Sequence, residues 1–143
     1  MLIAHVIRDK GANVHTLTAD ATLEQAAKEL HARKVGALVV MGDDGALMGV
    51  LSERDIVREV SRRGAACLGE RVASAMSRDV ITATPDETVD DGLARMTDRR
   101  IRHLPILAEG KLVGIVSIGD LVKHRIAAVE MEAAAMVAYI STH

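Results

Sequence analysis

Aromatic side chains are almost absent from this 143-residue chain, which has no Trp and no Phe and a single Tyr at position 139. The core must therefore be aliphatic, and any flat ligand would be held by Val, Ile, Leu and Met. The stacking platforms that bind single-stranded nucleic acid are missing. A formal net charge of -2 also provides no basic field of the kind that nucleic-acid-binding proteins use. We therefore expect no nucleic-acid partner.

Cysteine is limited to Cys67, which has no second cysteine to pair with, so nothing indicates an oxidising compartment. The N-terminal residues lack the apolar segment of a signal peptide, and no run is long enough to span a bilayer. We find no catalytic triad pattern, no metal-ligand spacing and no phosphate-loop motif. The sequence thus predicts a cytoplasmic protein that is not an enzyme, with no catalytic cofactor, no metal and no membrane partner.

What the sequence does contain is an internal repeat. An offset of 66 residues (14 to 80) lays the first half on the second, with a one-residue gap at the turns 42–45 and 108–110. The matching pairs include Val14/Val80, Thr16/Thr82, Asp20/Asp86, Thr22/Thr88, Arg33/Arg99, Leu38/Leu104, Ser52/Ser117 and Asp55/Asp120. Two copies are too few for a solenoid. The repeat instead predicts two half-domains that share one core and a pseudo-twofold axis.

Each copy predicts the order β-α-β-β-α, so the fold class is α+β. In the first copy we expect a strand at 14–18, a helix at 22–33, a hairpin of 36–41 with 46–51, and a helix from Ser52. In the second copy the same elements fall at 80–84, 88–99, 103–107 with 111–116, and from Ser117. The predicted division is a first motif at 2–60, a linker at 61–79 with a short helix near 69–76, a second motif with its lead-in helix at 68–125, and a helical tail at 126–143.

The pattern Ser-x-x-Asp occurs once in each copy, as Ser52 to Asp55 and Ser117 to Asp120, directly after a predicted strand. It is typical of a helix N-cap, in which the Ser oxygen accepts a hydrogen bond from the backbone N–H three residues later. The same helix start also presents N–H groups suited to phosphate, beside an Asp able to accept from two ribose hydroxyls. Spacing alone does not decide between a cap and a ligand site.

The doubled unit resembles the CBS domain pair, also called a Bateman module. The likeness is carried by VHTLTADATLEQAAKELHARKVGALVVM with GVLSERDIV, and by VITATPDETVDDGLARMTDRRIRHLPIL with GIVSIGDLV. It covers roughly residues 2–125 and is nearest to small stand-alone bacterial members. The resemblance implies two sheets that face each other and two clefts related by the pseudo-dyad. Such clefts commonly hold AMP, ADP, ATP, NAD(H) or S-adenosylmethionine.

The resemblance also implies a role for particular positions. The Asp of each motif would hold a ribose, the Ser would meet the first phosphate, and Thr with neighbouring backbone would line the adenine slot. Hairpin residues would form the opposite wall, and basic residues would face phosphates. The predicted nucleotide-binding residues are Thr16, Ala37, Leu38, Ser52, Glu53, Arg54, Asp55, Val80, Thr82, Arg102, His103, Leu104, Pro105, Ser117 and Asp120.

The two predicted sites differ in sequence. The first copy carries Glu53 and Arg54 after its Ser, whereas the second carries Ile118 and Gly119 there and has Arg102 and His103 on its hairpin instead. Cationic groups are thus divided between the copies. This asymmetry predicts that one cleft takes a mononucleotide and the other a longer ligand such as NAD or ATP.

Two functions remain open from the sequence. The first is a regulatory sensor that binds adenosine nucleotides, shifts between conformations and acts on an unknown target protein. The alternative is a dimeric structural adaptor whose nucleotide clefts are vestigial. In both cases we expect a homodimer, with the aliphatic faces around 121–126 and the Ala- and Met-rich tail as candidate contacts.

Overall fold

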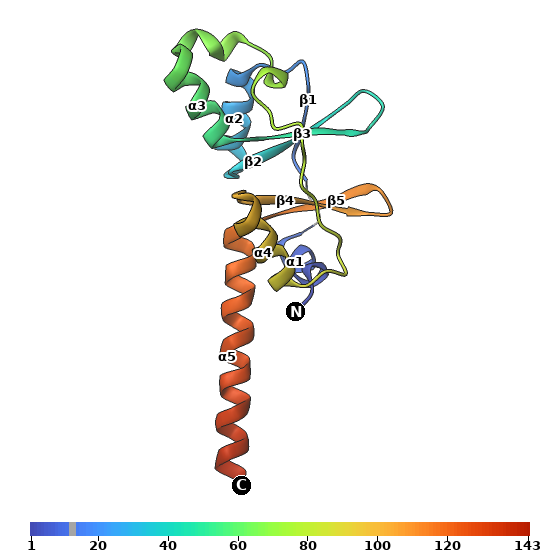
Figure 1. The fold of residues 1–143 in the computed structure, drawn as a ribbon, viewed down its shortest axis with the longest axis vertical. Helices are drawn as coiled ribbons and strands as arrows, with labels where there is room; N and C mark the ends of the chain where they lie inside the picture. Colours follow the sequence, from blue (N-terminus) through green and yellow to red (C-terminus); the bar gives the residue numbers. More distant parts are fainter. Residues whose placement is uncertain (12–13) are drawn as a thin grey trace. The chain divides into compact units, whose positions relative to one another are not determined.

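The computed structural model describes residues 1–11 and 14–143 and divides into two compact units. One unit takes in Met1–Ala12 with Thr82–His143, and the other is Asn13–Ile81. We call them the second-repeat unit and the first-repeat unit. Each is α+β and carries one copy of the repeat (Figure 1), so the expected fold class is confirmed.

The first-repeat unit packs its helices on a three-stranded sheet. Its elements are β1 (Thr16–Thr18), α2 (Leu23–Arg33), β2 (Ala37–Met41), β3 (Leu47–Ser52), α3 (Glu53–Arg63) and the 3-10 turns η1 (Ala65–Gly69) and η2 (Val72–Ser74). The sheet order is β1-β2-β3, with β1 parallel and β3 antiparallel to β2. Its core is aliphatic, as expected: Leu23, Ala26, Leu30, Leu38, Val40, Leu51, Ile56 and Val72, with Cys67 buried among them.

The second-repeat unit contains α1 (Ile3–Lys10), α4 (Val89–Arg99), β4 (His103–Ala108), β5 (Lys111–Ser117) and α5 (Ile118–Thr142). Strands β4 and β5 form an antiparallel hairpin. Ile3, Leu104 and Leu121 approach the backbone of Gly92 on α4, where the missing side chain leaves them room. The hairpins and helix starts expected in both copies are confirmed, as is the helical tail, which continues α5 without a break.

The prediction of a strand at 80–84 is wrong. Only Ala83 pairs, in one parallel bridge to Ile106, whereas β1 forms a full strand at the corresponding place. In the first copy the N–H of Val39 donates to the oxygen of His15 at 3.4 Å. The residue that corresponds to Val39 is Pro105, which has no N–H to donate. The ladder therefore ends at one bridge.

The segments that lead into each copy are also different from expectation. The short helix expected near 69–76 is a 3-10 turn at Val72–Ser74, and the N-terminal helix α1 was not predicted at all. Helix α1 packs on the second repeat: the N–H of Ile3 donates to the oxygen of Glu87 at 2.9 Å. The segment before the second copy packs on the first, where Val72 N–H donates to Ala21 oxygen at 2.7 Å. The segment before each copy therefore packs in the unit that contains the other copy.

Candidate functional site

Both Ser-x-x-Asp motifs form helix caps. The Ser52 hydroxyl accepts from the Asp55 N–H at 3.3 Å, and Asp55 Oδ2 accepts from the Ser52 N–H at 2.8 Å. Ser117 and Asp120 repeat this reciprocal pair at 3.1 and 2.8 Å. The same box also starts α2 at Thr22 and α4 at Thr88. The cap interpretation is therefore confirmed, and cap geometry alone does not mark a ligand site.

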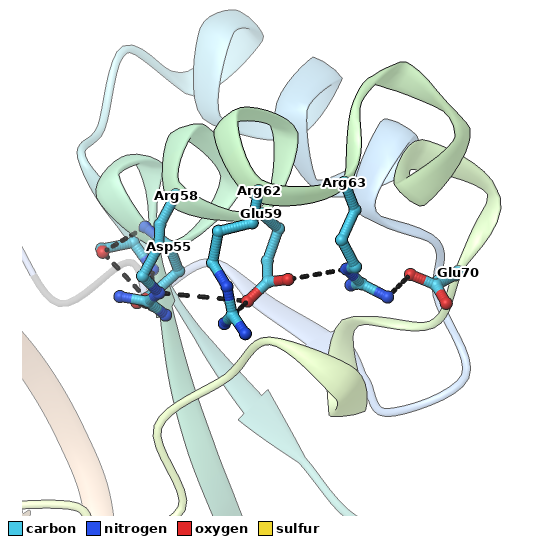
Figure 2. Close-up of polar contacts among 7 residues, drawn as sticks. Asp55, Arg58, Glu59, Arg62, Arg63 and Glu70 are labelled. Atoms are coloured by element: carbon cyan, nitrogen blue, oxygen red, sulfur yellow. Dashed lines mark hydrogen bonds and ion pairs between the residues drawn. The ribbon is translucent and has the colours of Figure 1, made fainter.

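Asp55 is held by more than the cap. It is 7% exposed, and its Oδ1 accepts from Arg58 Nη2 at 2.8 Å. Figure 2 shows that Arg58 lies between Asp55 and Glu59, with its Nε 3.9 Å from Glu59 Oε1. Glu59 is 6% exposed and accepts from Arg63 Nε at 2.9 Å, and Arg63 in turn pairs with Glu70 after η1. These contacts fix the Asp55 carboxylate before any ligand arrives.

Asp120 is fixed from another part of the chain. Lys10, the last residue of α1, places its Nζ 2.6 Å from Asp120 Oδ2 and 2.9 Å from the oxygen of Ile115. Next to it, His124 Nε2 lies 3.1 Å from Asp9 Oδ2. Burial on its own would raise the pKa of the Asp120 carboxyl, but the hydrogen bonds from Lys10 and Ser117 outweigh it. The pKa of Asp120 therefore lies below its usual range.

We expect Lys10→Met to raise the pKa of Asp120, because the partial burial stays while the ammonium is lost. A 13C NMR titration of the Asp120 carboxyl measures this directly. Arg8→Met, on the exposed part of the same helix, is the matched control and should leave that titration unchanged. An Asp120 titration that is equal in Lys10→Met and wild type would contradict the assignment of Lys10 as its partner.

The hairpin residues predicted for the adenine wall lie beside the caps. Ala37 pairs with Ser52 and His103 with Ser117, at the same register in the two units. The oxygens of Gly36 and Arg102 accept from the N–H groups of the residues after each Ser, at 3.0 and 2.8 Å. The strand end, the Ser and the Asp are thus brought together in each unit.

The side chains of several predicted wall residues point elsewhere. Leu38 is 1% exposed and belongs to the core of the first-repeat unit, and Leu104 is fully buried. Pro105 is also buried, and its oxygen accepts from the Ala83 N–H at 3.1 Å. The side chains of these three residues are therefore not placed to line an adenine slot.

The remaining predicted residues fall in both units. Thr16 is exposed on β1, at the register of Val39. Thr82 is half-buried and its oxygen accepts from Arg95 Nη1 at 3.0 Å. Val80 is half-buried near the end of the first-repeat unit. In the part of the chain that the structure describes, no hydrogen bond or ion pair joins these three residues to the caps.

In the described chain, one backbone N–H group remains at the start of each of α3 and α5, as it does at Glu24 in α2 and at Asp90 in α4. In α3 the N–H groups of Ser52, Glu53 and Asp55 are used by the cap and by Gly36. In the described chain this leaves the Arg54 amide of α3 and, by the same count, the Gly119 amide of α5 available to an anion. Glu53, Arg54 and Arg102 are exposed. Each unit therefore offers one amide, one Ser hydroxyl and one fixed carboxylate at the end of a strand.

The sequence interpretation missed Lys10 and Arg58, the cations that hold the two carboxylates. Arg58 had a readable signal, because a residue three positions after an Asp in a helix lies on the same face. Lys10 had no such signal, since it lies 110 residues from Asp120.

Among the described residues, no group of three or more His, Cys, Asp or Glu could hold a metal ion. In that same part of the chain, no helix is both long and apolar enough for a transmembrane span.

Comparison with known proteins identifies this arrangement. The family model of the CBS domain matches residues 5–62 and 72–127. The CBS domain-containing protein CBSX3 of Arabidopsis thaliana mitochondria is 36% identical over 129 residues, which cover 85% of this chain and 63% of that protein. The chain spans 66% of another curated relative, a 17.7 kDa protein of Acidianus ambivalens.

Solved structures agree. The crystal structure of the CBS-domain containing protein ATU1752 from Agrobacterium tumefaciens has a TM-score of 0.84 and 40% identity, and the match covers 87% of this chain and 92% of that one. The CBS domain pair of protein MJ0100, solved with 5′-methylthioadenosine and S-adenosyl-L-methionine, shares the fold at a TM-score of 0.74 and 24% identity over 90% and 98% of the chains. The chain belongs to the CBS domain family, and its two β-α-β-β-α motifs form a CBS pair.

Proposed function

We propose that the chain is a non-catalytic regulatory module that binds an adenosine ligand at the helix start of each repeat. The observation that carries this proposal is the repeated geometry of strand end, Ser, fixed Asp and available amide. A phosphate fits the amide and hydroxyl because a helix N-terminus favours negative charge. The two oxygens of Asp55 or Asp120 can accept from the two hydroxyls of a ribose.

The candidate ligands are AMP, ADP, ATP, NAD(H) and S-adenosylmethionine. The complex of the MJ0100 pair with 5′-methylthioadenosine and S-adenosyl-L-methionine, neither of which carries a phosphate, supports the adenosine part of this class as a property of that protein. The two sites are inequivalent in this proposal. One has Glu53 and Arg54 with Arg58 behind its Asp, and the other has Arg102 and His103 with Lys10 behind its Asp. We infer that one takes a mononucleotide and the other a longer ligand.

Binding would favour the conformation with higher affinity and so shift the population of the pair. The signal would pass to a target protein by contact. We further propose that the module works as a homodimer and that it is cytoplasmic.

A thermal-shift screen with these ligands tests the proposal. We expect at least one adenosine ligand to raise the melting temperature, because a ligand that binds only the folded state stabilises it by mass action. Asp55→Asn and Asp120→Asn should each reduce the shift, since an amide cannot accept from both ribose hydroxyls with the same strength. Asp91→Asn is the matched control, because Asp91 occupies the same capping position in α4 and has no proposed ligand.

A second function is favoured by one observation. Asp55 and Asp120 already have cationic partners inside their own units, Arg58 and Lys10. If those contacts replace the ribose, the sites are vestigial and the chain is a dimeric structural adaptor. The absence of a shift with every adenosine ligand, in a protein that is dimeric, would support the adaptor and contradict the sensor.

A further inference from the structure

Helix α5 leaves its own unit halfway along its length. Its inner face packs through Leu121, which is fully buried, and through the partly buried His124 and Ala128. From Val129 to Thr142 every residue is exposed, and Figure 1 shows this part of α5 extending away from α4 and the β4–β5 hairpin. Ten of its fourteen side chains are apolar. A helical segment of this length is marginal in water on its own, so it needs a partner.

A second face of α5 carries a regular apolar seam. Its members are spaced by 4, 3, 4, 3 and 4 residues: Val122, Ile126, Val129, Ala133, Met136 and Ile140. This is the a/d pattern of a coiled coil, with β-branched Ile at two of the a positions. The large members are between 41% and 65% exposed, including Val122 and Ile126, where the inner face still packs on the unit. The seam is therefore distinct from the face that docks α5 on its own unit.

Charge indicates what covers the seam. The positions that flank it hold Lys123 and Arg125 in the first half of the helix and Glu130 and Glu132 in the second. The residues three and four positions away from either Glu are all uncharged, so neither has a cation beside it on its own helix. The only charges beyond Ile126 are acidic, which is opposite to the basic polar face of a helix that lies on a membrane.

We propose that the seam is covered by α5 of a second copy in an antiparallel coiled coil, with the twofold axis between Ala127 and Ala128. Ile126 then packs against the partner's Val129, and Val122 against the partner's Ala133. In this register Lys123 faces the partner's Glu130, and Arg125 faces the partner's Glu132. All four flanking contacts join opposite charges.

Other arrangements match the charges less well. An antiparallel register shifted by one heptad brings Glu130 against the partner's Glu130, and Glu132 against the partner's Glu132. A parallel pair joins Arg125 to the partner's Glu130, but it leaves Lys123 opposite the partner's Ile118 and Glu132 opposite the partner's Val137. Lys123 is thus the residue that distinguishes the orientations. Arg125 is a poorer probe, because it also contacts Asp90 at 3.3 Å in its own unit.

Sedimentation velocity on the full chain over a concentration series, without nucleotide, tests this inference, which rests on the proposed homodimer. We expect wild type to dimerise, and Lys123→Glu to raise the dimer Kd about tenfold or more, because two symmetric attractions become repulsions. Glu130→Lys should do the same. An equimolar mixture of the two variants, and the double variant Lys123→Glu with Glu130→Lys, should both recover the dimer. Lys111→Glu makes the same charge change on the exposed end of β5 and is the control.

Each contrary outcome is distinguishable. A dimer unaffected by Lys123→Glu would overturn the antiparallel coiled coil and leave the homodimer standing. Weakening by Glu130→Lys that the double variant does not reverse would indicate the parallel pair instead. A wild-type chain that is monomeric throughout would overturn both the inference and the homodimer, while the ligand screen would still report separately on the adenosine sites. Far-UV circular dichroism verifies that each variant keeps its helices.

Discussion

Gly49→Ala is expected to lower the free energy of unfolding of the first-repeat unit by about 3 kcal/mol, whereas Gly114→Ala costs about 1 kcal/mol or less. The two glycines occupy the same place in the repeat. A Cβ at Gly49 would lie 2.7 Å from the backbone oxygen of Ser77 and 2.8 Å from Met76 Sδ. The atoms nearest to a Cβ at Gly114 would be those of the Ile7 side chain, at 3.3 Å.

The difference arises from what covers each strand. Residues 76–77 are tied to β3 by hydrogen bonds in both directions between Val50 and Ser77, at 3.1 and 2.9 Å, so their backbone cannot withdraw. Ile7 on α1 can change rotamer to make room. Urea unfolding of the two variants measures both effects. Equal destabilisation at the two glycines would contradict this account of how the lead-in segments pack.

Acid is expected to destabilise the second-repeat unit through Glu87, by at most about 3 kcal/mol as the pH falls from about 5 to about 2. Arg95 donates to both carboxylate oxygens of Glu87, at 2.6 and 3.0 Å, and the Thr84 N–H donates at 2.8 Å. The hydrogen bond from Arg95 is the main cause that lowers the pKa of Glu87 from 4.5 to about 2, against the opposing effect of burial.

Because the pKa of Glu87 is lowered in the folded state, acid removes stability. A carboxyl whose folded pKa is depressed adds stability above its unfolded pKa, and that stability is lost as the pH falls toward the folded value. Urea unfolding of wild type and Glu87→Gln at a series of pH values measures it: the variant should be less stable at pH 7 and less sensitive to acid. Glu109→Gln, in the exposed turn of the β4–β5 hairpin, should follow wild type. A Glu87→Gln curve parallel to that of wild type would contradict the prediction.

The repeat made most of the fold predictable. Four helix starts were predicted correctly, at Thr22, Ser52, Thr88 and Ser117. The Gly-containing turns predicted both hairpins. The false strand at 80–84 was predicted from its β-branched residues, and Pro105 removes the donor that Val39 supplies in the first copy. Helix α1 was missed although the offset of 66 residues lays it on residues 69–76, where a short helix was expected.

The sequence predicted one part of the candidate site and missed another. The cap residues and the hairpin ends came together as expected, since they are close in sequence or joined by strand pairing. What holds the carboxylates was not predicted. Arg58 and Lys10 fill the same role from unrelated positions, one within α3 and one from the opposite end of the chain. The repeat thus preserves the Asp and not its partner, a further source of inequivalence between the sites.

The helix start of each repeat is proposed to bind an adenosine phosphate. A 1H–15N NMR titration with AMP and then ATP tests this proposal most directly, because the amides of Arg54 and Gly119 each report on their own site. We predict the largest shifts at the amides of Arg54 and Gly119, with smaller ones at Ala37 and His103 on the paired strand ends, and different saturation points for the two units. Shifts confined to other parts of the chain, or no shifts with either nucleotide, would contradict it.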